Sequence, residues 1–263
     1  MKNIAFYGGG NISQAVIEGL IFSGFDPKNI FFVDRNIKNQ NKLKKLKVRS
    51  LKNNKKVKID LFMLAVKPKD AIEAYQEIIT NFKNPKVVSL VAGIKSKKYI
   101  YLDKEIEFLR AMPNTSSRFG LGITALYNSS FKKTNFLKAV ALLKKVGIVI
   151  EVDKESKIDE FTGTIGSGPA YFFYLLKSYE KKLMSICNGD KKIAREIMVN
   201  LIKGVAASVE NNGNLSNLIQ AVKSKKGTTE AGLKSFQSNK LGISFEKGLN
   251  AAIKRSKEIS NEF

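Results

Sequence analysis

The sequence predicts an N-terminal α/β domain with a doubly wound sheet, followed by a C-terminal domain made only of helices. In the first part of the 263-residue chain, short apolar strand patterns alternate with helical patterns. A glycine-rich turn follows the first of these strands. Beyond residue 153 every periodic segment is helical, so we expect two domains, at residues 1–153 and 154–263.

Apolar runs indicate the strands of the first domain. The first run, residues 4–7, is followed by three glycines and then by residues at helical spacing up to Gly24. The unbroken apolar run at residues 61–66 is typical of a strand buried on both faces of a parallel sheet. Other strands are expected at residues 30–33, 87–91, 106–109 and 148–152, and helices at 36–47, 71–82 and 131–145.

Five helical segments are expected in the second domain, at residues 155–186, 190–212, 214–223, 228–238 and 243–261. Residues 170–176 are apolar on every side of their helix, so this helix must be covered on several faces. An obligate dimer provides that cover, and packing within one chain is the alternative.

Composition restricts the chemistry. The chain is 43% hydrophobic and 26% charged, which is typical of a protein that folds around a core. It contains no histidine, which excludes Ser-His-Asp and Cys-His nucleophiles and histidine-ligated zinc, and we expect no metal site. A lone cysteine, Cys187, together with the lack of a signal-peptide or membrane-spanning pattern, predicts a cytoplasmic protein with no membrane partner.

The net charge of +23 formally suggests a nucleic-acid partner. The lysines are scattered along the chain, however, with dense stretches only at residues 38–58 and 223–226. Lysine, asparagine, isoleucine and phenylalanine all have A/T-rich codons, so a biased genome is enough to explain the surplus. Because no nucleic-acid-binding motif accompanies the charge, we expect no nucleic-acid partner.

The glycine-rich turn at residues 8–13 lies where a dinucleotide-binding fingerprint is expected, between a strand and a helix. Gly8 permits the tight turn, and Gly10 lets a pyrophosphate approach the backbone at the helix N-terminus. A small residue, Ser13, stands where the third glycine is usual. We expect the cofactor to contact Gly8, Gly10, Asn11, Ile12 and Ser13.

Two neighbouring residues after the second strand point to different cofactors. Asp34 is placed to bind the adenosine ribose, which favours NAD. The neighbouring Arg35 and the lysine-rich helix after it offer positive charge to a 2′-phosphate, which favours NADP. We predict that NADPH is the preferred cofactor and that NADH is accepted more weakly.

Three further segments follow strands of the sheet and are expected at the same edge as the glycine turn. These segments are residues 65–68, 89–93 and 112–115. Taken without its context, Lys67 is better explained as a solvated loop lysine, and a simple Pro-Asn turn is the alternative for residues 113–114. The expected additional cofactor contacts are Ala65, Val66, Lys67, Pro68, Ala92 and Gly93.

Five motifs together resemble one known family. Residues 8–13, 65–68, 110–115, 166–172 and 227–233 are similar, in order and spacing, to pyrroline-5-carboxylate reductase. The resemblance implies an N-terminal Rossmann domain and a helical domain that interlocks with a partner as a homodimer, or as a ring of such dimers. It implies an oxidoreductase that uses NAD(P)H to reduce 1-pyrroline-5-carboxylate to L-proline, the last step of proline biosynthesis.

This reaction needs no histidine or metal, because the cofactor carries the electrons. The expected substrate contacts are Asn114, Ser224, Gly227, Thr228 and Thr229. Backbone N–H groups of Gly227 and Thr228 would bind the carboxylate, and the hydroxyls of Thr229 and Ser224 are the candidate catalytic groups. A plain helix N-cap at Ser224 or Thr228 is the alternative.

The sequence departs from the family at two lysines, and it leaves two alternative functions open. Lys225 and Lys226 stand where the family usually has proline and glycine. Another Rossmann oxidoreductase, acting on a hydroxy acid or imine, is one alternative, although Lys177 and Lys181 fit the catalytic lysine of 3-hydroxyacid dehydrogenases poorly. The other alternative is a basic nucleic-acid-binding protein.

Overall fold

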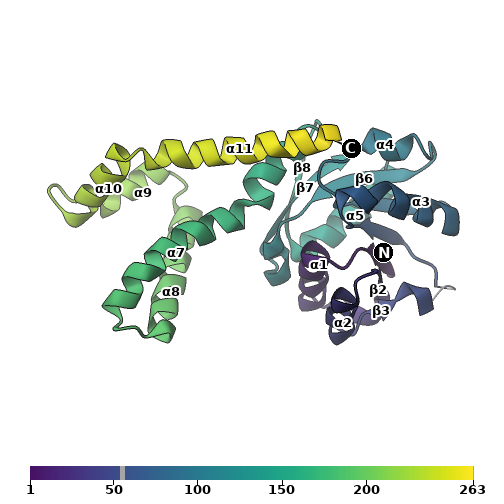
Figure 1. Ribbon diagram of the computed structural model, residues 1–263, viewed down its shortest axis with the longest axis horizontal. Coiled ribbons are helices and arrows are strands. Elements are labelled where there is room, and N and C mark those ends of the chain that lie inside the picture. The colour runs from purple at the N-terminus through teal and green to yellow at the C-terminus, as the bar shows by residue number, and fades with distance from the viewer. Residues whose placement is uncertain (54–56, 263) are drawn as a thin grey trace. The chain divides into compact units, whose positions relative to one another are not determined.

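The computed structural model describes residues 1–53 and 57–262 (Figure 1). These residues form two compact units, one comprising Met1–Pro169 with Asn250–Phe263 and the other Ala170–Leu249. The division falls inside two long helices, α7 (Gly168–Ile186) and α11 (Leu241–Glu262). The domain boundary expected after residue 153 stays a prediction.

The first unit is built around an eight-stranded sheet with the order β3-β2-β1-β4-β5-β6-β7-β8. Neighbouring strands are parallel except β6 and β7, which are antiparallel. The connections run outward in opposite directions from β1 and β4, and such a switch point is where open α/β sheets bind ligands. The strands are β1 (Ile4–Tyr7), β2 (Ile30–Val33), β3 (Arg49–Ser50), β4 (Leu61–Leu64), β5 (Lys86–Ser89), β6 (Glu107–Met112), β7 (Gly122–Asn128) and β8 (Gly147–Glu151).

Helices pack on both faces of this sheet, which confirms the predicted doubly wound architecture. Side chains of β1 alternate between two cores, with Ile4 and Phe6 in one and Ala5 and Tyr7 in the other. Because both faces are covered, the whole of β1 is buried, as an unbroken apolar run predicts. The first core includes side chains of α1 (Asn11–Phe22), α2 (Ile37–Lys45) and α5 (Lys133–Leu143), and the second those of α3 (Ala71–Asn81) and α4 (Ser96–Ile100).

The other expected strands and helices of this unit are confirmed to within a few residues, but three elements were not predicted. These are β3, α4 and β7. The largest omission is β7, which pairs antiparallel with β6 and parallel with β8. Its position depends on pairing with residues distant in sequence, so its local pattern was an insufficient signal.

The expected helix at residues 155–186 is wrong as a single helix. The structure instead has α6 (Lys157–Phe161), a π-helical turn at Thr162–Gly166, and then α7. A Cβ atom on Gly163 would lie 2.6 Å from the backbone nitrogen of Ile253 in α11, so this turn and the end of α11 are in close contact. Close contact here explains why both segments belong to the unit of the sheet.

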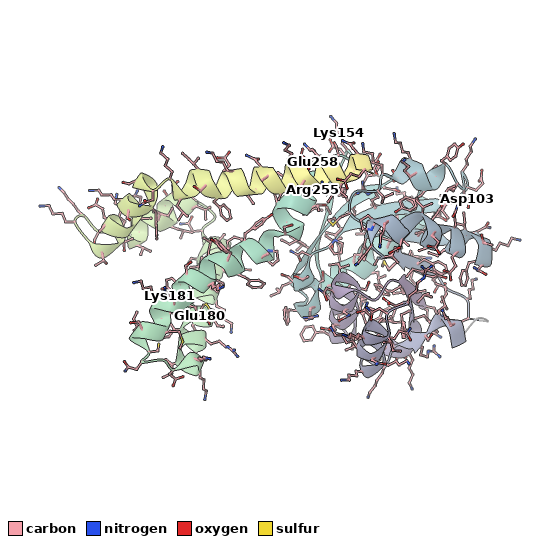
Figure 2. The ribbon with its side chains drawn as sticks, viewed as in Figure 1. Asp103, Lys154, Glu180, Lys181, Arg255 and Glu258 are labelled. Atoms are coloured by element: carbon pink, nitrogen blue, oxygen red, sulfur yellow. The ribbon has the colours of Figure 1, made fainter. Side chains whose placement is uncertain are left out.

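The end of α11 is also held by buried polar groups. Asp159 of α6 is buried and accepts hydrogen bonds from the hydroxyls of Ser256 (3.4 Å) and Ser260 (2.9 Å). On the exposed side of the same helix, Arg255 pairs with Glu258 at 3.3 Å (Figure 2). The C-terminal helix is therefore anchored to the sheet unit by side chains about 100 residues apart in sequence.

The second unit is entirely helical in its described residues, as predicted. It contains most of α7, then α8 (Lys191–Asn211), α9 (Leu215–Val222), α10 (Thr228–Ser238) and the start of α11. Side chains determine two of the starts: Asp190 accepts hydrogen bonds from the first turn of α8, and Asn214 from that of α9. No helix in the described part of the chain combines the length and apolar character needed to cross a membrane.

Candidate functional site

The turn between β1 and α1 has a backbone that requires glycine. Gly8 has φ +100°, a conformation that other residues rarely adopt, and its N–H donates to the Val33 carbonyl at 2.8 Å. A Cβ atom at this position would lie 2.4 Å from the carbonyl oxygen of Ala65. Gly8 therefore lets the turn pass directly beside the end of β4.

Two side chains of α1 donate hydrogen bonds to the carbonyl groups of this turn. The buried hydroxyl of Ser13 donates to the Gly8 carbonyl at 2.6 Å, and the Gln14 side-chain amide donates to the Gly9 carbonyl at 2.7 Å. The residue at the third fingerprint position thus contributes a hydrogen bond that glycine cannot make. Sequence reasoning missed Gln14, for which the fingerprint offers no signal.

Gly10 leaves open space at the start of α1. It is the N-cap of the helix, no side chain caps the first turn, and no atom lies within 4 Å of a Cβ placed on it. The first N–H groups of α1 have no partner within the helix, and such a terminus favours a phosphate. This geometry fits the approach of a pyrophosphate to the backbone at Gly10.

Asp34, at the end of β2, is held tightly against the glycine turn. One carboxylate oxygen accepts from the Gly9 N–H at 2.5 Å and from the Asn39 amide at 3.1 Å. The other accepts from the Asn36 N–H at 2.5 Å. These bonds fix the carboxylate at the edge of the sheet where an adenosine ribose is normally bound.

Arg35 is bound to an acidic residue that the sequence did not single out. Its Nη2 lies 2.5 Å from Oε1 of Glu73 in the first turn of α3. The hydrogen bond to Glu73 raises the pKa of Arg35 above its ordinary value, so the guanidinium stays charged. No local pattern links these residues, which are 38 positions apart.

These residues surround a cavity of about 390 Å³ at the carboxyl ends of β1, β2 and β4. Seven predicted cofactor contacts line it: Gly8, Gly10, Asp34, Arg35, Ala65, Val66 and Lys67. Asn11, Ile12, Ser13, Pro68, Ala92 and Gly93 do not line this cavity. Eight residues that were not singled out complete the lining: Tyr7, Val33, Asn36, Asn39, Lys69, Asp70, Ala74 and Glu77.

Small residues after β5 have a packing role in addition to their predicted one. Gly93 has φ +79°, and a Cβ atom on it would lie 2.4 Å from the Ile259 side chain of α11. Ala92 packs against a small core with Met112 and Ile158. Contact between this loop and a cofactor ring stays a prediction.

Asn114 is buried and already bonded within the first unit. Its amide donates to the Ile165 carbonyl of the π-helical turn at 3.4 Å, and its oxygen accepts from the Ile123 N–H at 3.2 Å. The side chain thus links β7 to the π-helical turn. Its contact with substrate stays a prediction, and the two hydrogen bonds give Asn114 a structural role as well.

The other predicted substrate residues lie together at the start of α10, in the second unit. Gly227 is the N-cap, and its N–H donates to the Ser224 carbonyl at 3.0 Å. A Cβ atom on Gly227 would lie 2.1 Å from the Ser224 hydroxyl. Since no side chain caps this helix, the alternative of an N-cap at Ser224 or Thr228 is wrong, and the first-turn N–H groups lack partners within the helix.

The loop before α10 accommodates the two unusual lysines. Lys226 has φ +60°, the left-handed conformation for which the glycine of the family is suited. Its N–H donates to the Glu230 carboxylate at 2.7 Å, and Lys223 pairs with the same carboxylate at 3.6 Å. The bond from Lys226, together with nearby lysines, lowers the pKa of Glu230. The loop therefore keeps the backbone shape that glycine favours.

The second unit exposes a large apolar surface. Phe172, Phe173 and Tyr174 are 61%, 67% and 75% exposed, on the helix that the sequence predicts to be covered on several faces. A groove of about 700 Å³ runs along the unit. Its apolar lining comes from Leu201, Val205, Val209, Leu215, Leu218, Ile219, Val222 and Leu233, with Thr229 at its wall. A surface of this size marks an interaction site.

Comparison with known proteins gives matches over the whole chain. Residues 155–259 match the family model described as pyrroline-5-carboxylate reductase dimerisation, and residues 3–93 match the model described as NADP oxidoreductase coenzyme F420-dependent. A pyrroline-5-carboxylate reductase of Haemophilus influenzae is 33% identical over 269 residues, which cover 100% of this chain and 99% of that protein.

Solved structures give the same result. A pyrroline-5-carboxylate reductase from Coxiella burnetii has a TM-score of 0.82 and 31% identity over 98% of each chain. A pyrroline carboxylate reductase from Plasmodium falciparum, solved with NADP bound, shares the fold with a TM-score of 0.87 and 22% identity over 98% of each chain. With a matching dimerisation model and full-length relatives about a third identical, this chain belongs to the pyrroline-5-carboxylate reductase family of oxidoreductases.

Proposed function

We propose that the protein reduces 1-pyrroline-5-carboxylate to L-proline with a reduced nicotinamide cofactor. The observation that carries the proposal is the cavity at the carboxyl ends of β1, β2 and β4, with the glycine turn as its wall. Full-length relatives with this activity in their names support the choice of substrate. The net charge of +23 is spread over the chain without a nucleic-acid-binding motif, so it does not favour the alternative of a nucleic-acid partner.

The residues that line the cavity support the binding of a dinucleotide. The open space at Gly10 accepts a pyrophosphate, and the fixed carboxylate of Asp34 stands at the expected ribose position. Gly8 and Ala65–Lys67 would form the wall toward the nicotinamide. When bound, the cofactor supplies the hydride, which is why the protein needs neither histidine nor metal.

The start of α10 supplies the substrate-binding groups in this proposal. The N–H groups of Gly227 and Thr228 bind the substrate carboxylate, helped by the helix dipole, once the Gly227 N–H leaves the Ser224 carbonyl to which it donates at 3.0 Å. The hydroxyl of Thr229 donates to the imine nitrogen as it becomes an amine, and Ser224 adds a further polar contact. Asn114 stays a predicted substrate contact.

The finer properties of the protein are proposed on the same basis. NADPH is the preferred cofactor, with NADH accepted more weakly, because Arg35 lines the cavity and α2 carries several lysines. The exposed apolar surface of the helical unit supports a homodimer, or a ring of such dimers. The lone Cys187 supports a cytoplasmic location.

Turnover is tested by mixing the full-length protein with 1-pyrroline-5-carboxylate and NADPH, and following the loss of reduced-nicotinamide absorbance. L-Proline should form in equal amounts. Cofactor oxidation without proline, or no oxidation by protein that binds NADPH, would contradict the proposed substrate. Salt-sensitive DNA binding without turnover would instead favour the basic-binding-protein alternative.

A further inference from the structure

The ion pair between Arg35 and Glu73 bears on which cofactor is chosen. Arg35 is the one residue at the end of β2 whose charge suits a 2′-phosphate, and it lines the cavity. Its guanidinium already binds Glu73 at 2.5 Å. Both side chains are mostly exposed, at 74% and 65%, so the pair is free to exchange partners.

Other acidic residues stand near the same guanidinium. Asp70 occupies the N-cap position of α3 without a capping side-chain hydrogen bond, and Glu73 and Glu77 follow it at helical spacing. Besides Glu73, the charges of Asp70 and Glu77 also raise the pKa of Arg35, which places both carboxylates within electrostatic reach of it. A 2′-phosphate entering here meets an arginine that is already paired with a carboxylate, and a cavity wall on which Asp70 and Glu77 stand beside Lys67 and Lys69.

We propose that Glu73 is a specificity-determining residue that limits the preference for NADPH by holding Arg35. A 2′-phosphate must compete with the Glu73 carboxylate for the Arg35 guanidinium, whose Nη2 Glu73 holds, whereas the 2′-hydroxyl of NADH leaves the pair intact. The inference rests on the proposed use of a nicotinamide cofactor. It assigns to α3, a helix outside the dinucleotide fingerprint, control over the ratio of the two affinities.

The test measures dissociation constants for NADPH and NADH by nicotinamide fluorescence, on the full-length protein at fixed ionic strength. Glu73→Gln should tighten NADPH binding about fivefold, the upper range for an exposed ion pair, and leave NADH binding within about twofold. Glu258→Gln is the matched control. It also removes one charge from an exposed Arg–Glu pair, on α11 and outside the cavity lining, and should alter neither constant (Figure 2).

A double-mutant cycle separates exchange of partners from general repulsion. In an Arg35→Ala background, Glu73→Gln should no longer tighten NADPH binding, because there is no guanidinium to release. If the effect persists in that background, or if both cofactors gain equally in the single variant, Glu73 acts only as a nearby charge and the proposal is overturned.

The cycle also distinguishes this inference from the proposed function. A protein that binds both cofactors as expected here but does not reduce 1-pyrroline-5-carboxylate contradicts only the proposed substrate. A protein that reduces the substrate while Glu73→Gln leaves the affinity ratio unchanged contradicts only the role of Glu73. Wild-type protein that binds neither cofactor contradicts both.

Discussion

Gly8 and Ala65 lie so close that a Cβ atom on Gly8 would sit 2.4 Å from the Ala65 carbonyl oxygen. The atom that would be displaced belongs to the backbone at the end of β4 and cannot move aside cheaply. Gly10, two residues along the same turn, has no atom within 4 Å of the corresponding position. One glycine therefore serves the fold, and the other leaves space that a ligand can use.

This contrast predicts opposite outcomes for two alanine variants. Gly8→Ala should lower the free energy of unfolding by about 2 kcal/mol or more, because it adds left-handed strain to the clash. Gly10→Ala should cost less than about 1 kcal/mol, yet weaken NADPH binding at least tenfold, about what a methyl group in the path of a pyrophosphate implies. Urea denaturation and cofactor titration of both variants check this. Normal NADPH affinity in Gly10→Ala would contradict the placement of the pyrophosphate.

The buried ion pair of Arg110 and Glu155 predicts a large stability effect. Arg110 is 1% exposed, and its Nη1 lies 3.0 Å from the Glu155 carboxylate. Glu155→Gln leaves a buried guanidinium without its counter-charge, so the free energy of unfolding should fall by about 3 kcal/mol. Ser96→Ala, which removes one hydrogen bond to the same carboxylate, should cost only about 1 kcal/mol. If both variants lose the same free energy of unfolding, the charge of Glu155 is not what stabilises this site.

Thr229 is predicted to act in the reaction rather than in the fold. Thr229→Val keeps the shape of the side chain but removes the proposed donor to the imine nitrogen. We expect kcat to fall about 100-fold, with NADPH affinity unchanged. Because no side chain caps α10, the thermal midpoint should stay close to that of the wild type. A near-normal kcat would remove Thr229 from the mechanism and favour Ser224.

Lys226 is predicted to be tolerated rather than inactivating. Its φ of +60° is costly for lysine, so Lys226→Gly should raise the stability by about 0.5 kcal/mol after allowing for the freer unfolded chain. The backbone bond to Glu230 is kept, so kcat should not change. Lys225→Gly, at a neighbour without positive φ, should lower the stability instead. Thermal unfolding of both variants, together with turnover, provides the comparison.

The apolar groove of the helical unit is predicted to form the interface between subunits, so a charge placed in it should disrupt the oligomer. Val205 lines the groove and is 58% exposed in the single chain. Val205→Glu places a charge in a surface that should be buried between subunits, so sedimentation at micromolar concentration should show monomers. Asn211→Glu, at the end of the same helix and outside the groove, should leave the oligomer intact. A Val205→Glu protein that stays oligomeric would exclude the groove as the interface.

Much of the architecture follows from local signals. The glycine turn, the alternation of strands and helices up to β6 apart from β3 and α4, and helices α8 to α11 are all expressed in periodicity and in residues such as Gly8 and Gly24. These signals act over a few residues, because backbone conformation and the 3.6-residue repeat are properties of short segments. The sequence by itself therefore determined the fold class and the position of the glycine-rich turn between β1 and α1.

The tertiary structure decided how distant residues are used. Glu73 binds Arg35, Asn114 bonds to the π-helical turn, and Asp159 anchors the end of α11. The partners in these contacts are between 38 and 101 positions apart in sequence. Such contacts form only when packing of the sheet and helices brings the segments together, and neither residue carries a local mark of its partner. For that physical reason the sequence did not reveal that Arg35 pairs with Glu73, and only the folded chain shows it.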